Sequence, residues 1–481
     1  MFRDQRLGKS RQDVVEYLSS RDADLRIFHS DLLVDRAHLL MLSEQNLISR
    51  DICYQIMAAI DDLMAEGPEA LGPGEDVHEA IEAYILQKVG PEGGRMHTGR
   101  SRNDEVATCI RLSLREEMLS LMVWQIGLLK TMLRIAAEHT ETVIPGFTHT
   151  QHAQPTTLAH HLLSHADAAA RDLSRLEEAY GRVNQSPLGA AAFASTGFMI
   201  DRTLTARLLG FEGLVENSMD AVSTRDFILE VLSDMAIVMV NLSRLAEELV
   251  LWSTSEFGYL ELDNLYASTS SIMPQKKNPD TAELARGKAG SVLGSLVAAH
   301  AICKALPMSY NRDLQEITPH LWRAVDWTAS TICILEGCLA TLKFNKERLE
   351  KSSGAGFSTA TEIADSLVRK TGMPFRTAHS IVGRIAATGG RPALADLDRI
   401  ALEMAGYKVS ERGFAPSDLK RALDAKSNVA LRANTGGPAP KETERMIKER
   451  LKMIALAEER LEQRRESASR ALADLKSRRP S

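Results

Sequence analysis

The stretch that decides the fold runs from Ala221 to Phe257, AVSTRDFILEVLSDMAIVMVNLSRLAEELVLWSTSEF, and contains neither glycine nor proline. Apolar side chains recur along it at helical spacing, for example at Phe227, Leu242 and Trp252. A helix over most of this stretch would be roughly 50 Å long at about 1.5 Å per residue. Much of the segment is apolar on more than one face, which favours burial by several neighbours in a helical bundle.

The rest of the chain is patterned in the same way. Further helical stretches are expected at about Val106 to Ile144, Leu158 to Tyr180, Thr281 to Leu306 and His320 to Leu342. Aromatic residues make up only 5%, whereas Ala, Leu, Glu, Met and Arg are plentiful and lose little freedom in a helix. The sequence therefore predicts an all-α protein. An oligomeric bundle explains several long, widely apolar helices most easily, and a large monomeric bundle is the alternative.

Breaks that contain glycine divide the chain, which at 481 residues is too long for one simple core. Gly90–Gly94 precedes the first long helix, and Ser352–Gly356 follows the last. The expected units are an N-terminal helical domain (1–105), a central bundle of long helices (106–353) and a C-terminal helical domain (354–481). The charged tail from residue 458 onward is expected to be a solvated, partly frayed helix.

Composition excludes several classes of function. A formal net charge of −6 gives no basis for a nucleic acid or an anionic membrane as the main partner. The five cysteines are scattered and form no CxxC pair, so neither a disulfide framework nor a zinc ribbon is indicated. The N-terminus is polar, and no uncharged apolar run is long enough to span a bilayer. We expect a cytoplasmic protein.

Function is expected in the polar breaks between the long helices. The first, His97–Asp104 (HTGRSRND), places two guanidinium groups, two hydroxyls and an amide just before a helix. It is either a solvated loop in which Asn103 or Asp104 caps the following helix, or an anion site. In the second case backbone N–H groups, the helix N-terminus and Arg102 would meet a carboxylate or a phosphate. The spacing favours neither interpretation over the other.

The second polar break, Pro145–Thr157, contains prolines near both ends and cannot be one continuous helix. Three histidines follow it: His160, His161 and His165. No glutamate lies between the last two as in an HExxH motif, and no cysteine is near. We therefore expect no metal and a helix-surface role for these histidines. His149, beside Thr148, is the better candidate for proton transfer.

The third polar break is Ser268–Asp280, STSSIMPQKKNPD. By itself it would be read as a flexible surface loop with solvated lysines at Lys276 and Lys277. A hydroxyl-rich loop with two lysines and an amide can also close over a carboxylate and supply cationic donors. It is not a nucleotide-binding loop, because the glycine framework of a phosphate loop is absent.

Together these segments resemble signature regions of the fumarase/aspartase superfamily. Ser270–Asn278 (SSIMPQKKN) matches the superfamily pattern SSxMPxKxN completely, and so long and irregular a pattern is very improbable by chance. Three segments resemble the argininosuccinate lyase branch: His97–Asp104, Asn217–Ala221 and Tyr310–Glu316. The resemblance extends over nearly the whole chain, from Ser19 to Pro438.

The resemblance implies a helical homotetramer of three-domain subunits, in which tetramerisation completes the central bundle and three subunits build each active site. It also implies a reversible β-elimination in which an N-substituted aspartate gives fumarate and an amine, here arginine. No metal or organic cofactor is implied, and the partners are these small molecules.

The reaction removes a weakly acidic proton next to a carboxylate, so catalysis must stabilise the aci-carboxylate dianion that forms. Lys276 and Asn278 suit this role as a cation and an amide donor. The resemblance makes Ser270 the general base, which requires backbone donors or cations around its alkoxide. His149 would protonate the leaving nitrogen, directly or through an ordered water.

The remaining site residues follow from the same resemblance. The carboxylates of the fumarate half would be held by Ser20, Ser101, Arg102, Asn103 and Thr148. Tyr310 and Gln315 would contact the rest of the substrate, and Asp280 would meet a positive group on the amine side. Ser271 and Met273 belong to the loop that closes over the substrate. His78 is either a substrate contact or a structural histidine.

Some positions depart from the pattern expected of animal members of the branch. Cys109 stands where an acidic residue is usual, Thr318 where a lysine is usual, and Thr269 where a glycine is usual. The segment Tyr310–Trp322 is more similar to the archaeal-type branch. A lyase for another N-substituted aspartate, such as ethylenediamine disuccinate, is therefore a second hypothesis. A non-catalytic, crystallin-like structural protein on the same fold is a third.

Overall fold

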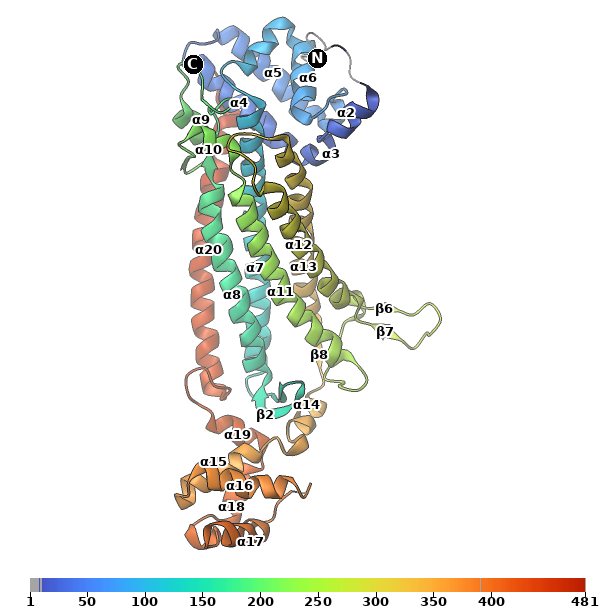
Figure 1. Cartoon of the computed structure of the whole chain (residues 1–481), viewed down its shortest axis with the longest axis vertical. Helices are drawn as coiled ribbons and strands as arrows, with labels where there is room; N and C mark the ends of the chain where they lie inside the picture. The colour runs from blue at the N-terminus through green and yellow to red at the C-terminus, as the bar shows by residue number, and fades with distance from the viewer. Residues whose placement is uncertain (1–7, 9–10, 390, 481) are drawn as a thin grey trace.

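The computed structural model describes residues 8, 11–389 and 391–480, and its helices form three tiers along one long axis (Figure 1). The N-terminal tier consists of α2 (Gln12–Leu18), α3 (Arg21–Asp24), α4 (Phe28–Glu44), α5 (Arg50–Glu66) and α6 (Val77–Val89). The long helices of the middle tier are α7 (Arg102–Glu138), α8 (Leu158–Val183), α11 (Asp226–Ser253), α12 (Asp280–Cys303), α13 (Ile317–Thr341) and α20 (Pro440–Ser477). Two shorter helices, α9 (Arg202–Leu208) and α10 (Ser218–Ser223), flank its upper end.

The lower tier consists of α14 (Lys346–Ser353), α15 (Ala360–Thr371), α16 (Phe375–Ala386), α17 (Leu394–Ala405), α18 (Pro416–Ala422) and α19 (Ala425–Leu431). The 3-10 turns are η1 (Leu25–Ile27), η2 (Pro68–Ala70), η3 (Pro91–His97), η4 (Asn264–Tyr266), η5 (Arg312–Glu316), η6 (Ala355–Phe357) and η7 (Ser410–Arg412). The strands are β1 (Val143–Thr148), β2 (Gln151–Thr157), β3 (Gln185–Ser186), β4 (Gly213–Leu214), β5 (Leu260–Glu261), β6 (Ser268–Thr269), β7 (Lys277–Asn278) and β8 (Lys343–Phe344). They pair only in twos, so the predicted all-α class is confirmed.

The stretch from Ala221 to Phe257 forms α11 over most of its length, as predicted. This helix packs against α8, α12 and α13, and α7 packs against α8 and α13. The predicted helix at Val106–Ile144 begins earlier and ends earlier than expected. It begins at Arg102 because Ser101 and Asp104 form a capping box there, and its expected last residues pass into β1.

The last helix, α20, runs back along the bundle and brings the C-terminus to the N-terminal tier (Figure 1). It packs on α7, α8, α4 and α9. Residues 354–481 therefore divide between a small cluster of helices with its own core on α15–α18 and a helix that belongs to the main core. The tail is not a frayed surface helix, because Leu461, Ala468 and Leu475 are buried.

The buried positions of α20 explain how so charged a helix joins the bundle. Ile447, Ile454, Leu461, Ala468 and Leu475 recur every seven residues, and each is at most 5% exposed. An apolar residue repeated at seven-residue spacing keeps one narrow seam of a helix against its neighbour, as in a coiled coil. Met446 and Ala457 are buried beside this seam, and most of the charged side chains lie on the other faces of the helix.

Helix α7 is the one described helix that is long and apolar enough, by length and composition, to cross a membrane. In its most apolar window, 67% of the residues are buried inside the protein. A core helix of a bundle passes the same test, and the contacts of α7 with α8, α13 and α20 account for its apolar surface.

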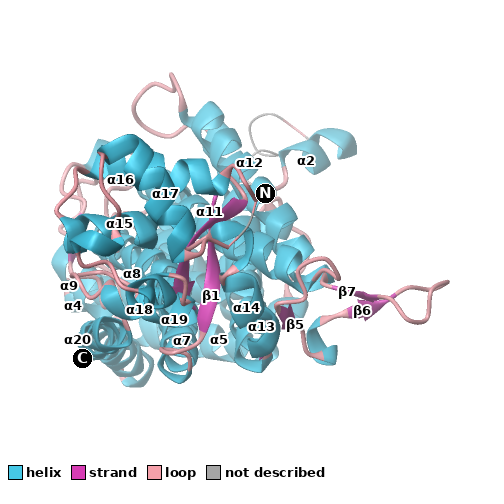
Figure 2. Cartoon of the chain, turned by 90° about the horizontal axis from the view of Figure 1, so that it is seen from below, coloured by secondary structure: helices cyan, strands magenta, loops and turns pink. Residues whose placement is uncertain are grey.

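Two hairpins leave the helical tiers. The β1–β2 hairpin lies between the lower end of the bundle and α14 and α19, which both contact it. The β6–β7 hairpin, in which Ser268 pairs with Asn278 and Thr269 with Lys277, projects sideways from the bundle (Figures 1 and 2). The second and third polar breaks, which carry the predicted catalytic residues, are thus β-hairpins with paired strands rather than unstructured loops.

Candidate active site

The start of α7 is built by the capping box of Ser101 and Asp104. The Ser101 hydroxyl accepts a hydrogen bond from the Asn103 N–H at 3.3 Å, and the Ser101 N–H donates to Asp104 at 3.0 Å. The other oxygen of Asp104 accepts from the N–H groups of Gly189 and Ala191. The N-cap is therefore Ser101 and neither Asn103 nor Asp104. This arrangement fixes Arg102 and Asn103 at the helix N-terminus, where anions are favoured.

Six of the predicted substrate-binding residues line one cavity of about 170 Å³ between the N-terminal tier and the bundle. They are Ser20, His78, Arg102, Asn103, Tyr310 and Gln315. They come from segments at residues 20, 78, 102–103 and 310–315, which the fold brings together. The structure thus brings Arg102 and Asn103 of the first polar break close to predicted substrate contacts that precede and follow them in the sequence.

The same cavity has charged walls that the sequence interpretation missed: Asp24, Glu75, Asp76, Arg225 and Arg312. Arg102 pairs with Asp76 at 3.0 Å, and Arg312 pairs with Glu75. The sequence signal for Asp76 is its position directly before Val77 and His78. The sequence signal for Arg225 is a cation at the start of a largely apolar helical stretch.

Arg225 is the cation of this cavity without a carboxylate partner among the described residues. It is 3% exposed, and its guanidinium donates only to the carbonyls of Val222 and Thr224, while Nε has no described partner. Burial lowers the pKa of Arg225 to about 10, so it stays charged at neutral pH. A buried, unpaired guanidinium is well suited to bind a carboxylate.

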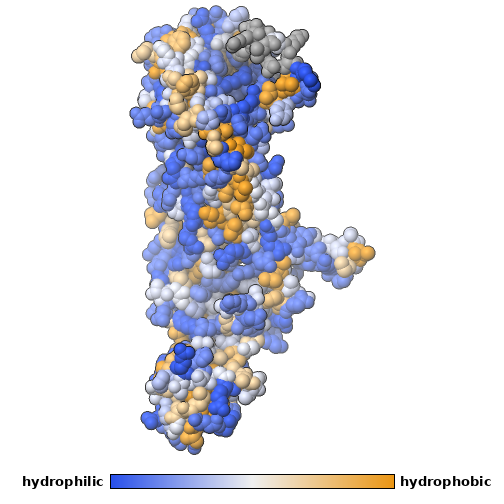
Figure 3. All heavy atoms as spheres, viewed as in Figure 1, coloured by the Kyte–Doolittle hydropathy of each residue, from blue (hydrophilic) through white to orange (hydrophobic). Residues whose placement is uncertain are grey.

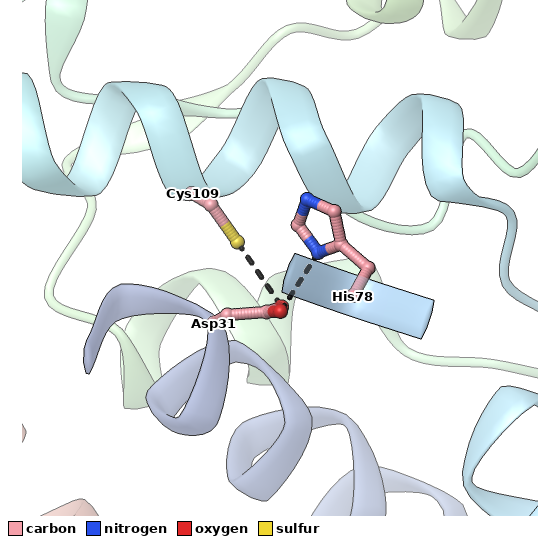
Figure 4. A group of neighbouring side chains, drawn as sticks. All are labelled: Asp31, His78 and Cys109. Atoms are coloured by element: carbon pink, nitrogen blue, oxygen red, sulfur yellow. Dashed lines mark hydrogen bonds and ion pairs between the residues drawn. The ribbon is translucent and has the colours of Figure 1, made fainter. Parts of the chain in front are cut away.

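His78 is held from behind by Asp31 (Figure 4). Its Nδ1 lies 2.7 Å from the Asp31 carboxylate, which also accepts a hydrogen bond from the Cys109 thiol at 3.4 Å. Burial alone lowers the pKa of His78, but the charge and hydrogen bond of Asp31 outweigh it and raise the pKa to about 10. His78 is therefore an imidazolium that is buried and also lines the cavity.

Arg100 serves the scaffold, in contrast to Arg102. It is buried and pairs with Asp35 at 2.6 Å and with Glu105 at 2.8 Å. Asp35 belongs to α4 and Glu105 belongs to α7, so the two ion pairs of Arg100 connect the N-terminal tier to the bundle. Removing one partner would leave an uncompensated buried charge.

The β1–β2 hairpin places Thr148 and His149 at its exposed tip. His149 has φ 54° and Thr150 has φ 58°, the left-handed conformation of a tight turn. Gly146 is required just before the tip, because a Cβ there would lie 2.4 Å from the carbonyl oxygen of Gln154. In one chain this hairpin lies at the lower end of the bundle, whereas the cavity lies at the upper end (Figure 1).

The β6–β7 hairpin carries Ser270, Ser271, Met273, Lys276 and Asn278. The Ser270 hydroxyl accepts hydrogen bonds from the N–H groups of Ile272 and Met273 at 3.3 and 3.0 Å. Such backbone donors are the environment that a serine alkoxide needs. At its base Ser268 donates to Asp280, the first residue of α12. Most of the hairpin is exposed in one chain, and it meets neither the cavity nor the β1–β2 hairpin.

Comparison with known proteins decides the family. A lyase family model matches residues 34–294, and an argininosuccinate lyase C-terminal model matches residues 357–430. The argininosuccinate lyase of Methanothrix thermoacetophila is 61% identical over 475 residues, which cover 99% of this chain and 98% of the relative. The chain belongs to the argininosuccinate lyase family.

Solved structures place this argininosuccinate lyase family member beside EDDS lyase as well. A crystal structure of EDDS lyase with formate has a TM-score of 0.88 at 33% identity and covers 94% of this chain and 90% of its own. A variant of EDDS lyase with bound fumarate has a TM-score of 0.86 at 32% identity with the same coverage. The identity to these structures is well below that to the archaeal argininosuccinate lyase.

The departures from the animal pattern of the argininosuccinate lyase family occupy different environments. Cys109 is buried and its thiol donates to Asp31, outside the cavity lining. Thr318 lines the cavity, and its hydroxyl donates to the Gln315 carbonyl at 2.9 Å. Thr269 lies in β6, paired with Lys277. Of these three residues, only Thr318 lines the cavity.

Proposed function

We propose that this chain cleaves argininosuccinate to fumarate and arginine by β-elimination. The observation that carries the proposal is the cavity, where Arg102, Arg225 and the imidazolium of His78 face a space of substrate-fragment size. Together with Arg312 they make four cationic groups at one site, which suit a dicarboxylate such as the fumarate half of the substrate. The 61% identity to an argininosuccinate lyase over the full chain supports arginine as the amine.

The proposed mechanism assigns one step to each hairpin. Ser270, as an alkoxide, takes the proton from the carbon next to a carboxylate, and the electron pair moves into that carboxylate. Lys276 and Asn278 stabilise the resulting dianion through charge and amide N–H groups. The C–N bond then breaks as the double bond of fumarate forms. His149 supplies the proton that the leaving nitrogen takes up, directly or through a water.

We further propose that the active form is a homotetramer in which three subunits contribute to each site. The predicted catalytic residues occupy two hairpins that do not meet the cavity within one chain. The middle tier also exposes apolar side chains, which form an orange band over α11 and α12 (Figure 3). Leu284, Leu293 and Val297 of α12 are 64%, 47% and 61% exposed. An apolar face of this kind on a bundle helix suits burial against another subunit.

The amine is identified by running the reaction backwards. The purified protein is incubated with fumarate and with arginine, ethylenediamine or other amines, and loss of fumarate absorbance is followed. Loss with arginine supports the proposal. Loss with ethylenediamine alone would instead support the second candidate, a lyase for ethylenediamine disuccinate. The observation behind that candidate is the TM-score of 0.88 to EDDS lyase. No loss with any amine would leave the crystallin-like structural role.

Shared sites are tested by mixing two inactive variants. Ser270→Ala removes the proposed base, and Arg102→Ala removes a cation of the cavity. Each homotetramer should be inactive, whereas tetramers reassembled from both chains should regain activity at sites that receive neither substitution. Mixed tetramers that form but stay inactive would contradict sites built from several subunits.

We place the enzyme in the cytoplasm, working on small molecules without a nucleic acid or membrane partner. Elimination here needs only acid–base and electrostatic groups of the protein, so the proposed mechanism uses no metal or organic cofactor.

A further inference from the structure

Two histidines of α8 converge on one carboxylate of α11, away from the cavity and both hairpin tips. His161 and His165 are one helical turn apart on α8. Nε2 of His161 lies 2.6 Å from Oε2 of Glu248, and Nε2 of His165 lies 2.8 Å from the same oxygen. The side chains of the three residues are 23%, 12% and 34% exposed.

The three groups are held in place rather than meeting by chance. The ring of His161 packs on Trp252 of α11 with 4.8 Å between centroids, and the rings of His161 and His165 meet edge to face at 5.3 Å. One ligand atom from each of the three residues lies within 4.8 Å of the others. Two helices that pack along much of their length therefore fix a two-imidazole, one-carboxylate set.

This ligand set has the chemistry of a zinc-class site. Zinc and its neighbours in the first transition row take imidazole nitrogen and carboxylate oxygen at about 2.0–2.2 Å. An i, i+4 histidine pair on a helix already points both rings to one side. Glu248 supplies the third ligand from another helix, α11, so no motif local to His161 and His165 contains it.

We propose that His161, His165 and Glu248 form a binding site for one zinc-class divalent cation per chain. The cation takes the place of the N–H···O contacts. Each imidazole then carries its proton on Nδ1 and turns the Nε2 lone pair to the cation. The net charge of the occupied site is +1, from a dication, one carboxylate and two neutral rings.

The fourth coordination position opens on solvent space. A cavity of about 140 Å³ is lined by His165 and Glu248 together with Asp172, Arg171 and Arg244. A site with three protein ligands and an open fourth position takes a water or an anion. The arginines offset the cost of bringing an anion there.

A cation bound at this site would hold helices α8 and α11 together. Thr157 caps the start of α8 and ends β2, so His161 lies one turn beyond the hairpin that carries His149. A cation bound to both helices fixes the first turns of α8 against α11. By mass action it stabilises the folded chain in proportion to its occupancy. The inference does not depend on the proposed reaction.

The experiment titrates the chelator-treated, full-length protein with Co²⁺ and with Zn²⁺. We expect the visible absorption bands of tetrahedral or five-coordinate Co²⁺ to saturate at one ion per chain and to be displaced by Zn²⁺. The thermal-unfolding midpoint should rise with Zn²⁺. Glu248→Gln, which nearly keeps the shape of the side chain, and His165→Ala should each weaken binding by more than the roughly 10- to 100-fold that outer partners of a metal cost.

His160→Ala is the matched control. His160 neighbours His161 on the same helix but contacts Thr156 and the Gly436 carbonyl instead of Glu248. It should bind Co²⁺ as the unsubstituted protein does. Circular dichroism checks that every variant is folded. Absence of saturable binding would overturn the proposal, as would equal losses in His160→Ala and Glu248→Gln. Either result leaves the fumarate–amine assay unaffected.

Discussion

The Asp31 carboxylate of α4 contacts Nδ1 of His78 of α6, and both side chains are at most 2% exposed. The pair joins two helices of the N-terminal tier and holds a cationic ring in the lining of the cavity. A neutral histidine at this place would bind a dicarboxylate less well. Asp31 therefore prepares the cavity for an anion without touching the ligand itself.

This pair predicts how stability depends on pH. The pKa of His78 is about 10 in the folded chain, whereas histidine in an unfolded chain has a pKa of about 6.5. The folded state holds a proton that the unfolded state has released between these values, so the free energy of unfolding falls as pH rises from about 6.5 to about 10. His78→Gln should reduce that slope, measured as the thermal-unfolding midpoint at fixed protein concentration. An unchanged slope would contradict a protonated His78.

Ser270→Ala should separate catalysis from stability. The side chain lies on a projecting hairpin and is not in the core, so the free energy of unfolding should stay within about 0.5 kcal/mol of the original. If Ser270 is the base, turnover of argininosuccinate should fall by about 100-fold or more. Ser255→Ala, in another exposed turn, is the control and should keep full activity. Near-normal turnover in Ser270→Ala would remove Ser270 from the mechanism.

The exposed face of α12 predicts a variant that fails to assemble. Val297→Glu places a charge on a residue that is 61% exposed in one chain and buried in the proposed tetramer. Light scattering after size-exclusion chromatography should report a smaller particle, and activity should fall with it. Leu402→Glu, on a residue of α17 that is 48% exposed, should leave the mass unchanged. A full-sized, active Val297→Glu protein would show that this face is not an interface.

Substitution of Gly146 tests whether activity depends on the backbone shape of the β1–β2 hairpin. In Gly146→Ala the new methyl group would meet the Gln154 carbonyl oxygen, so the strands must separate next to Thr148 and His149. Turnover should fall while the helical circular dichroism is retained. Gly127→Ala, where nothing lies within 4 Å, is the control and should stabilise α7 by about 0.5–1 kcal/mol. Equal activity of the two variants would separate the hairpin from catalysis.

The sequence predicted the fold well where apolar periodicity is broad. The apolar positions from Phe227 to Trp252 are spread over more than one face, and this pattern belongs to a helix with several neighbours, as α11 is. The packing of α20 on the bundle was not predicted, because charged residues dominate its sequence and its buried side chains form only a narrow stripe. The signal for it is the seven-residue repeat of apolar side chains from Ile447 to Leu475.

The sequence predicted individual residues of the candidate site but not which of them lie together in the cavity. Short motifs identified Arg102, His78 and Tyr310 separately, and the structure places all three on one cavity. Arg225 and Asp31 carry no motif, because their importance comes from what surrounds them. Arg225 matters since it is buried without a carboxylate, and Asp31 since it faces His78. Sequence spacing does not report such contacts between distant segments.

The seam of α20 also sets an order on synthesis. A chain leaves the ribosome from its N-terminus, and its segments begin to fold in that order. The strip of α7 that α20 covers therefore stays exposed until α20 has been synthesised, and the Arg36 guanidinium cannot donate to the Leu475 carbonyl, 439 positions later, before then. A nascent chain that stalls before residue 440 therefore presents the uncovered apolar strip of its helical bundle to chaperones.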